Sequence, residues 1–247
     1  EAITAFEQGL EYNNQLKDSS GIGFSYYNIG LANHFQGHYA IAIENFVKSA
    51  EIRKHIGDTA SLVASLTSIG EVFRLREENN NAIINYNEAL KYKQAINNIQ
   101  ILAYLYSEMA LIYKSIMQYK TALCYIDTAM NYSQQINYKR GIITLLNYKA
   151  GIYKEQNKEK EALLIYQETS KKYKEIGFEP GLIQSNIAVA EILIKKERFS
   201  DIMKIMEVIE PLALENNLLD EQTQISELKY KIYKNLGRTN LALRELE

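Results

Sequence analysis

The sequence predicts an all-α protein. Two prolines and twelve glycines in 247 residues leave few positions for tight turns, which favours long helices over many short strands. Glycine or asparagine also recurs at a step of forty residues, at Gly57, Asn97, Asn137, Gly177 and Asn217. These two residue types most readily take the left-handed conformation that ends a helix. Helix ends that recur in phase indicate a repeat of forty residues.

Small and large apolar residues follow the same step. Alanine recurs at one phase, with a large residue one helical turn later: Ala42 and Phe46, Ala82 and Tyr86, Ala122 and Ile126, Ala162 and Tyr166. A second phase is also small: Gly30, Gly70, Ala110, Ala150 and Ala190. A small residue beside a large one lets two helices cross closely. Each repeat is therefore predicted to hold two amphipathic helices of about 16 to 18 residues, joined by a tight turn.

The period predicts a single repeat domain over residues 1–247, with roughly 11–12 helices. Its predicted parts are a partial repeat 1–17, full repeats 18–57, 58–97, 98–137, 138–177 and 178–217, and a partial repeat 218–247. The fifth full repeat departs from the pattern, because Ile202 and Met206 replace the alanine and the large residue, and Pro211 lies within the expected second helix. Proline removes a helical hydrogen bond, so we expect a kink or an early helix end near Glu210.

Residues 26–50, YYNIGLANHFQGHYAIAIENFVKSA, carry the signature most clearly, with Gly30 in the first helix, Gly37 in the turn, and Ala42 and Phe46 in the second. In this spacing, over essentially the whole chain, the sequence resembles the tetratricopeptide repeat (TPR) family. The forty-residue unit is similar to the long form in bacterial Rap-type regulators and TPR-containing sensor histidine kinases. The resemblance implies a right-handed superhelical α-solenoid of antiparallel helix pairs, whose first helices line a groove that binds peptides or helices.

One turn after the second small phase, the first helices carry mostly basic residues: His34, Arg74, Lys114, Lys154, Ile194 and Lys234. By the resemblance these positions face the groove, where a basic ladder suits an acidic peptide or a carboxylate. The same residues fall in the last turn of a helix, where a cation offsets the helix dipole, so both interpretations stay open.

Further polar and aromatic residues are placed on the same wall by the resemblance: Tyr27, Asn28, Glu71, Tyr104, Ser107, Glu108, Asn147 and Glu191. Such a mixture suits contacts with a peptide or protein. For each of these residues taken singly, solvated helix surface is the alternative interpretation.

Residues 53–59, RKHIGDT, look like a catalytic cluster because Lys54, His55 and Asp58 surround Gly57. The glycine predicts a helix end, however, so the histidine and the aspartate need not face the same way. The sequence contains no glycine-rich phosphate loop, no paired catalytic carboxylates and no Ser-His-Asp arrangement. We therefore predict a protein that is not an enzyme and has no cofactor.

Two other candidates have simple structural interpretations. His34 and His38 have the i,i+4 spacing that can hold a metal on a helix, but Gly37 predicts a turn between them, and we predict no metal site. Cys124 lies in a helical pattern and is expected to be a partly buried structural thiol rather than a nucleophile.

The charge and termini restrict the partners. A net charge of -2 and a pI near 6.1 give no broad basic field, so we predict no nucleic-acid binding by this segment. There is no signal-peptide pattern and no apolar run of about 20 residues, so we predict no membrane contact by it. The chain begins at Glu1 and ends within a helical pattern, so we expect part of a longer protein.

The favoured function is a non-catalytic protein- or peptide-binding TPR domain. By the resemblance, it is the sensing or docking segment of a larger bacterial signalling protein, such as a sensor histidine kinase or a transcription regulator. One alternative is a structural scaffold for a protein assembly, including a homodimer, and another is a Rap-type peptide-responsive cytoplasmic regulator. The cytoplasm is the favoured compartment, with the periplasm expected if the chain belongs to a membrane sensor kinase.

Overall fold

The computed structural model describes residues 2–95 and 98–245, which form helices and connecting turns with no strand among them. The all-α prediction is therefore confirmed. The chain divides into two compact units, residues 1–136 and 137–247, and each is described by itself. The assignment of the whole chain to one repeat domain stays a prediction.

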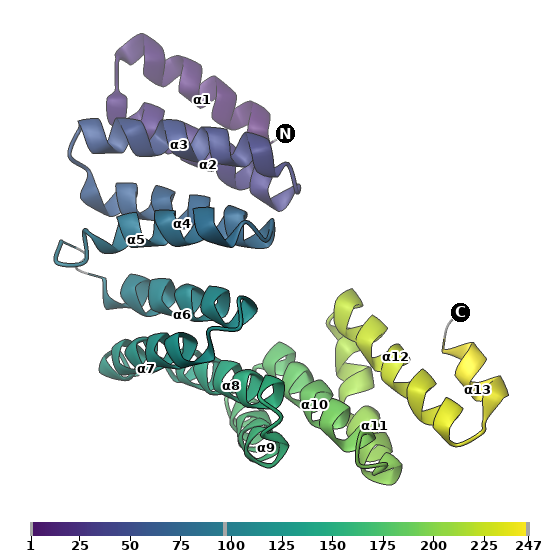
Figure 1. Ribbon diagram of the computed structural model, residues 1–247. Helices are drawn as coiled ribbons and strands as arrows, with labels where there is room; N and C mark the ends of the chain where they lie inside the picture. Colours follow the sequence, from purple (N-terminus) through teal and green to yellow (C-terminus); the bar gives the residue numbers. More distant parts are fainter. Residues whose placement is uncertain (1, 96–97, 246–247) are drawn as a thin grey trace. The chain divides into compact units, whose positions relative to one another are not determined.

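Within each unit, antiparallel helices pack against their neighbours along the chain (Figure 1). The helices of the first unit are α1 (Ala2–Leu16), α2 (Ser19–Phe35), α3 (Tyr39–His55), α4 (Thr59–Leu75), α5 (Asn79–Leu90), α6 (Ile99–Ser115) and α7 (Tyr119–Gln135). Those of the second are α8 (Lys139–Glu155), α9 (Glu159–Glu175), α10 (Glu179–Ile194), α11 (Phe199–Glu215), α12 (Leu219–Asn235) and α13 (Thr239–Arg244). The even-numbered members α2 to α12 are the first helices of the predicted repeats.

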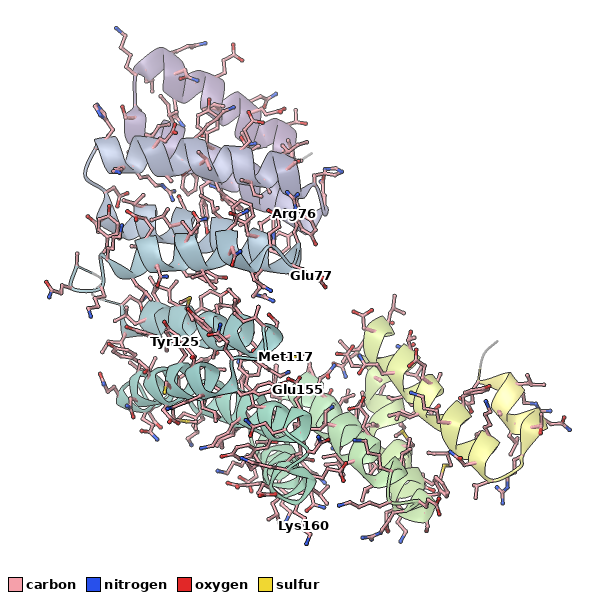
Figure 2. The ribbon with its side chains drawn as sticks, in the orientation of Figure 1. Arg76, Glu77, Met117, Tyr125, Glu155 and Lys160 are labelled. Carbon is pink, nitrogen blue, oxygen red and sulfur yellow. The ribbon has the colours of Figure 1, made fainter. Side chains whose placement is uncertain are left out.

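A left-handed residue marks the junctions between helices at a regular step of twenty residues. Positive φ angles occur at Lys17, Gly37, Gly57, Glu77, Met117, Asn137, Asn157, Gly177, Glu197, Asn217 and Gly237. The predicted helix ends are confirmed at every described position, and Asn97 lies outside the described residues. At the first of them, the Asp58 N–H donates to Arg53 O at 2.9 Å, which satisfies a carbonyl at the end of α3. Figure 2 shows Glu77 and Met117, two of the positions without glycine or asparagine, at one edge of the first unit.

The close helix crossings predicted from the small residues are present in the first unit. A Cβ atom added to Gly30 would lie 2.8 Å from the ring of Phe46, and one added to Gly70 would lie 2.6 Å from the ring of Tyr86. Both rings are buried beside the alanine one turn earlier in their helix. No side chain larger than hydrogen fits at these glycines without displacing a ring, so the crossing fixes how each first helix sits on its second helix.

The fifth repeat achieves the same packing with different side chains. Ile202 and Met206 are fully buried and belong to one core cluster with Ala190 and Ile192. Ile202 takes the place of the smaller alanine, and Met206 takes the place of the large residue. Methionine is flexible and fills irregular space well. The repeat therefore keeps its core although its sequence leaves the pattern.

Helix α11 corrects one prediction. It runs without interruption from Phe199 to Glu215 and contains Pro211, so the expected early end near Glu210 is wrong. Both Pro211 and Glu207, whose carbonyl loses its helical donor to the proline, are exposed. Water can solvate that carbonyl, and packing of the buried face holds the helix together through the proline.

Replacement of Pro211 by alanine should stabilise the second unit. Proline is about 3 kcal/mol less favourable than alanine in a helix interior, so we expect Pro211→Ala to raise the free energy of unfolding by about 1–3 kcal/mol in denaturant titrations. Val208→Ala, at an exposed site on the same helix, is the control and should change it by less than about 0.5 kcal/mol. An unchanged or lowered value for Pro211→Ala would show that the helix needs the proline.

Candidate functional site

All residues predicted for the groove lie on first helices. On α2, α4 and α6 they form the set that we call the first wall: Tyr27, Asn28, His34, Glu71, Arg74, Tyr104, Ser107, Glu108 and Lys114. On α8, α10 and α12 they form the second wall: Asn147, Lys154, Glu191, Ile194 and Lys234. The two walls belong to different units and are described separately.

An ionic cluster joins α4 to α6 in the first wall. Arg74 Nε donates to Glu108 Oε2 at 2.6 Å, and the Tyr86 hydroxyl of α5 donates to the same oxygen at 3.4 Å. Glu108 is only 5% exposed. Glu71 lies close enough to Tyr104 for its charge to act on the pKa of the tyrosine hydroxyl. The wall residues of the second and third repeats are thus bound to one another, and a buried carboxylate lies at the centre of the contact.

Burial controls the protonation of this cluster. It raises the pKa of the Glu108 carboxyl; the Arg74 guanidinium offsets part of this effect, and the negative charge of Glu71 adds to it. Burial, together with the charges of Glu108 and Glu71, also raises the pKa of the Tyr104 hydroxyl. At neutral pH, Tyr104 is therefore an uncharged hydroxyl beside two carboxyl groups.

The second wall repeats the arrangement with weaker contacts. Lys154 Nζ of α8 donates to Glu191 Oε2 of α10 at 2.7 Å, and the two side chains are 33% and 44% exposed. Asn147 Nδ2 donates to Ser185 Oγ of α10 at 2.9 Å, and its Oδ1 accepts from Thr169 Oγ1 of α9. Successive first helices are again joined by polar side chains of the wall.

Four further wall residues make contacts within their own helix or across the turn that follows it. The His34 ring lies 5.4 Å from Phe35 and 6.1 Å from Tyr39, between ring centroids. Lys234 lies over the ring of Tyr230, one turn earlier in α12. Asn28 Nδ2 and Ser107 Oγ donate to carbonyl oxygens of their own helices, those of Phe24 and Tyr104.

The basic ladder is therefore not a row of equivalent cations. His34, Arg74, Lys114, Lys154 and Lys234 do lie in the last turns of their helices, as the helix-dipole interpretation requires. Arg74 and Lys154 also have carboxylate partners one repeat further on. That pairing has a sequence signal that the ladder alone does not reveal, namely opposite charges about 34 to 37 residues apart.

Arg53 is a buried residue that sequence reasoning missed. Its Nη1 donates to Ser61 O at 2.8 Å and to Ser65 Oγ at 2.9 Å, and its guanidinium lies 4.8 Å from the ring centroid of Tyr27. Burial lowers the pKa of this guanidinium. Arg53 thus ties α3 to α4 and supports a wall tyrosine of α2 from behind.

The other residues of the RKHIGDT stretch are separated by the helix junction. His55 is the exposed last residue of α3, whereas Asp58 caps α4 and accepts a hydrogen bond from the Ser61 N–H at 3.1 Å. The Ser61 hydroxyl and, to a smaller extent, this backbone bond lower the pKa of the Asp58 carboxyl. The aspartate has a structural task, which agrees with the interpretation of Gly57 as a helix end.

The structure corrects the expectation for Cys124, which is exposed rather than partly buried. It lies two residues after buried Ala122, and two helical positions place a side chain on the far side of the helix. His34 and His38 lie on either side of the turn at Gly37, as expected. Among residues 2–95 and 98–245, no three His, Cys, Asp or Glu side chains lie close enough to hold a metal ion. No helix in those ranges is long and apolar enough to span a membrane.

Comparison with known proteins identifies the family. The model of the soluble NSF attachment proteins, SNAP, matches residues 62–230, which is more than half of the chain. The chain belongs to the SNAP family. The matched residues run from α4 to α12, so they include the ionic cluster of the first wall and all of the second wall except Lys234. The TPR-like repeats predicted from the sequence are thus those of this family. No curated protein matches this SNAP-family chain significantly.

Solved structures show the same fold at low identity. Aspartyl phosphate phosphatase F from Bacillus subtilis has a TM-score of 0.79 and 16% identity, over 95% of this chain and 62% of that protein. The Rap conjugation gene regulator of plasmid pLS20, in complex with the Phr* peptide, has a TM-score of 0.72 and 13% identity, over 92% and 62%. BtubC (BKLC) from P. vanneervenii has a TM-score of 0.73 and 13% identity, over 87% of this chain and 91% of that protein. The chain thus spans about three fifths of the phosphatase and of the conjugation regulator.

The two cross-repeat ion pairs should differ sharply in their effect on stability. Arg74→Met leaves the buried Glu108 carboxyl without its cation, and breaking such a pair typically costs about 3–5 kcal/mol. Lys154→Met breaks the partly exposed pair with Glu191, which is worth about 0–1 kcal/mol. Denaturant titrations of the two variants measure this difference directly. Equal losses would contradict the assignment of Glu108 as a buried carboxylate that needs its arginine.

Proposed function

We propose that the chain is a non-catalytic module that binds a peptide or a protein segment on its first-helix walls. The observation that carries this proposal is the lateral bonding of wall residues between repeats, Arg74 to Glu108 in one unit and Lys154 to Glu191 in the other. These contacts hold the walls in a defined geometry before any partner arrives. Such preorganisation lowers the entropic cost of binding.

The first wall offers chemistry that suits a polar peptide. Tyr104 is 39% exposed, so it presents part of its ring to a ligand, while its uncharged hydroxyl lies beside Glu71 and Glu108. Tyrosines of this kind are frequent anchors in protein interfaces. Because Arg74 and Lys154 are paired within the chain, an acidic ligand would have to compete with Glu108 and Glu191 for them.

The comparisons favour the same role. A neighbour in fold, the conjugation gene regulator, has been solved with a peptide bound. The family name describes its members as attachment proteins, which fits docking rather than catalysis. We further propose that the module is the sensing or docking segment of a larger cytoplasmic signalling protein, as in the Rap-type regulators.

A scaffold is the second candidate, because attachment alone requires no response to a ligand. In that case the walls would hold a constitutive assembly together. Native mass spectrometry separates the two candidates: a module that binds a peptide reversibly gives a free chain that acquires mass on peptide addition. A scaffold gives an assembly that persists without any added ligand.

Selection of binding peptides from a displayed random library, with the full chain as bait, tests the proposed function. Tyr104→Ala should weaken the selected peptides about tenfold or more, since truncation of an interface anchor costs upwards of about 1–2 kcal/mol. Tyr12→Ala is the matched control, because Tyr12 is an exposed tyrosine of α1 outside both walls. If the selected peptides bind the Tyr104→Ala variant and an Asn147→Ala variant as tightly as they bind the unmodified chain, the walls are not the binding surface.

A further inference from the structure

The two walls hold a carboxylate at the same position of the repeat. Glu71 of α4 and Glu191 of α10 are related by three steps of forty residues. Glu191 accepts a hydrogen bond from Lys154 Nζ of the preceding first helix, α8, at 2.7 Å. The same three steps lead from Lys154 back to His34 of α2, so the first unit has a histidine where the second has the lysine.

The histidine does not take over the role of the lysine. The His34 ring packs against aromatic side chains of α2 and α3, and its Nδ1 atom is buried without a hydrogen-bond partner among the described residues. Arg74, one turn further along α4 than Glu71, donates its Nε–H to Glu108 instead. In the part of the chain that the structure describes, Glu71 therefore forms no ion pair.

A negative charge without a partner thus remains on the first wall. Glu71 is half-buried, and the cation nearest to it along α4, that of Arg74, is bound to Glu108. Burial raises the pKa of the Glu108 carboxyl and of the Tyr104 hydroxyl, and the charge of Glu71 adds to both effects. A carboxylate partly removed from water is stabilised by a nearby cation, which the chain supplies at Glu191 but not at Glu71.

We propose that Glu71 receives a lysine or arginine side chain of a peptide bound to the first wall. This inference rests on the proposed function and adds the charge of the ligand to it. Lys154 on Glu191 shows, within this chain, which group a carboxylate at this position accepts. Tyr104 adds a second contact, because its ring is partly exposed beside Glu71 and the face of such a ring attracts an ammonium or guanidinium group. The ligand is therefore basic, opposite in charge to the one that the basic ladder predicts.

The His34→Lys variant tests the missing partner without any peptide. It should place an ammonium group on Glu71, as in the second wall, and raise the midpoint of urea unfolding by about 0.3 M. In a Glu71→Gln background the same change should give no gain. His55→Lys is the matched control, because His55 is exposed and also lies in the last turn of its helix, where a cation offsets the helix dipole. Equal gains from the two lysine variants would overturn the proposal.

Peptides selected on the full chain from the displayed random library test the ligand itself. They should contain a lysine or an arginine, and replacement of that residue by norleucine should weaken binding about tenfold, as expected for a hydrogen bond between charged groups. With the Glu71→Gln variant, the same replacement should change binding less than about twofold. Glu51→Gln, at an exposed position of α3 outside both walls, is the control and should keep the tenfold effect.

The outcomes separate this inference from the proposed function. Selected peptides that lose affinity with Tyr104→Ala but contain no basic residue, or that lose the same affinity on norleucine replacement with Glu71→Gln, contradict the inference alone. Peptides whose affinity is unchanged by Tyr104→Ala and Asn147→Ala contradict the proposed function and the inference together. Circular dichroism checks that each variant is folded. If Glu71→Gln fails to fold, the comparison of His34→Lys with His55→Lys decides the inference.

Discussion

The close crossing between a small residue of a first helix and a large residue of the following helix is the contact on which the architecture depends. Gly30 against Phe46 and Gly70 against Tyr86 leave no room for a side chain. Helices that approach so closely need short connections, and each described junction within a pair reverses the chain at a left-handed residue. Within each unit, the resulting step of twenty residues brings first helices side by side, as α4 and α6 or α10 and α12 are, which creates the walls.

Polar contacts between successive first helices within each wall follow from this stacking. Buried charge is tolerated only where partners are near, and the stacking places Arg74 of α4 beside Glu108 of α6. These residues fix the spacing of the repeats, and under the proposed function they hold Tyr104 and its neighbours as a binding surface. A partner that binds there would act on the spacing through the residues that hold it.

The periodic features of the structure could be predicted from the sequence because they follow from single residues at a fixed step. Gly57 and Asn137 end helices by their backbone preference alone, wherever the helix lies. The pairing of Arg74 with Glu108 and the buried setting of Arg53 were missed because they depend on side chains brought together from different helices. Pro211 is the opposite case. Its local tendency to end a helix is overridden by the packing of the rest of α11. The exposure of Cys124 could have been predicted from its position two residues after Ala122.

A double-mutant cycle between Gly70 and Tyr86 tests the central claim most directly. Gly70→Leu forces a side chain into the ring, and Tyr86→Ala removes that ring, so each change alone should lower the free energy of unfolding by about 1–5 kcal/mol. If the crossing is the decisive contact, the leucine occupies the space that the ring vacates. The double variant should then be more stable than the sum of the two losses by about 1–3 kcal/mol in denaturant titrations. Strictly additive losses would show that the two positions do not share one close contact.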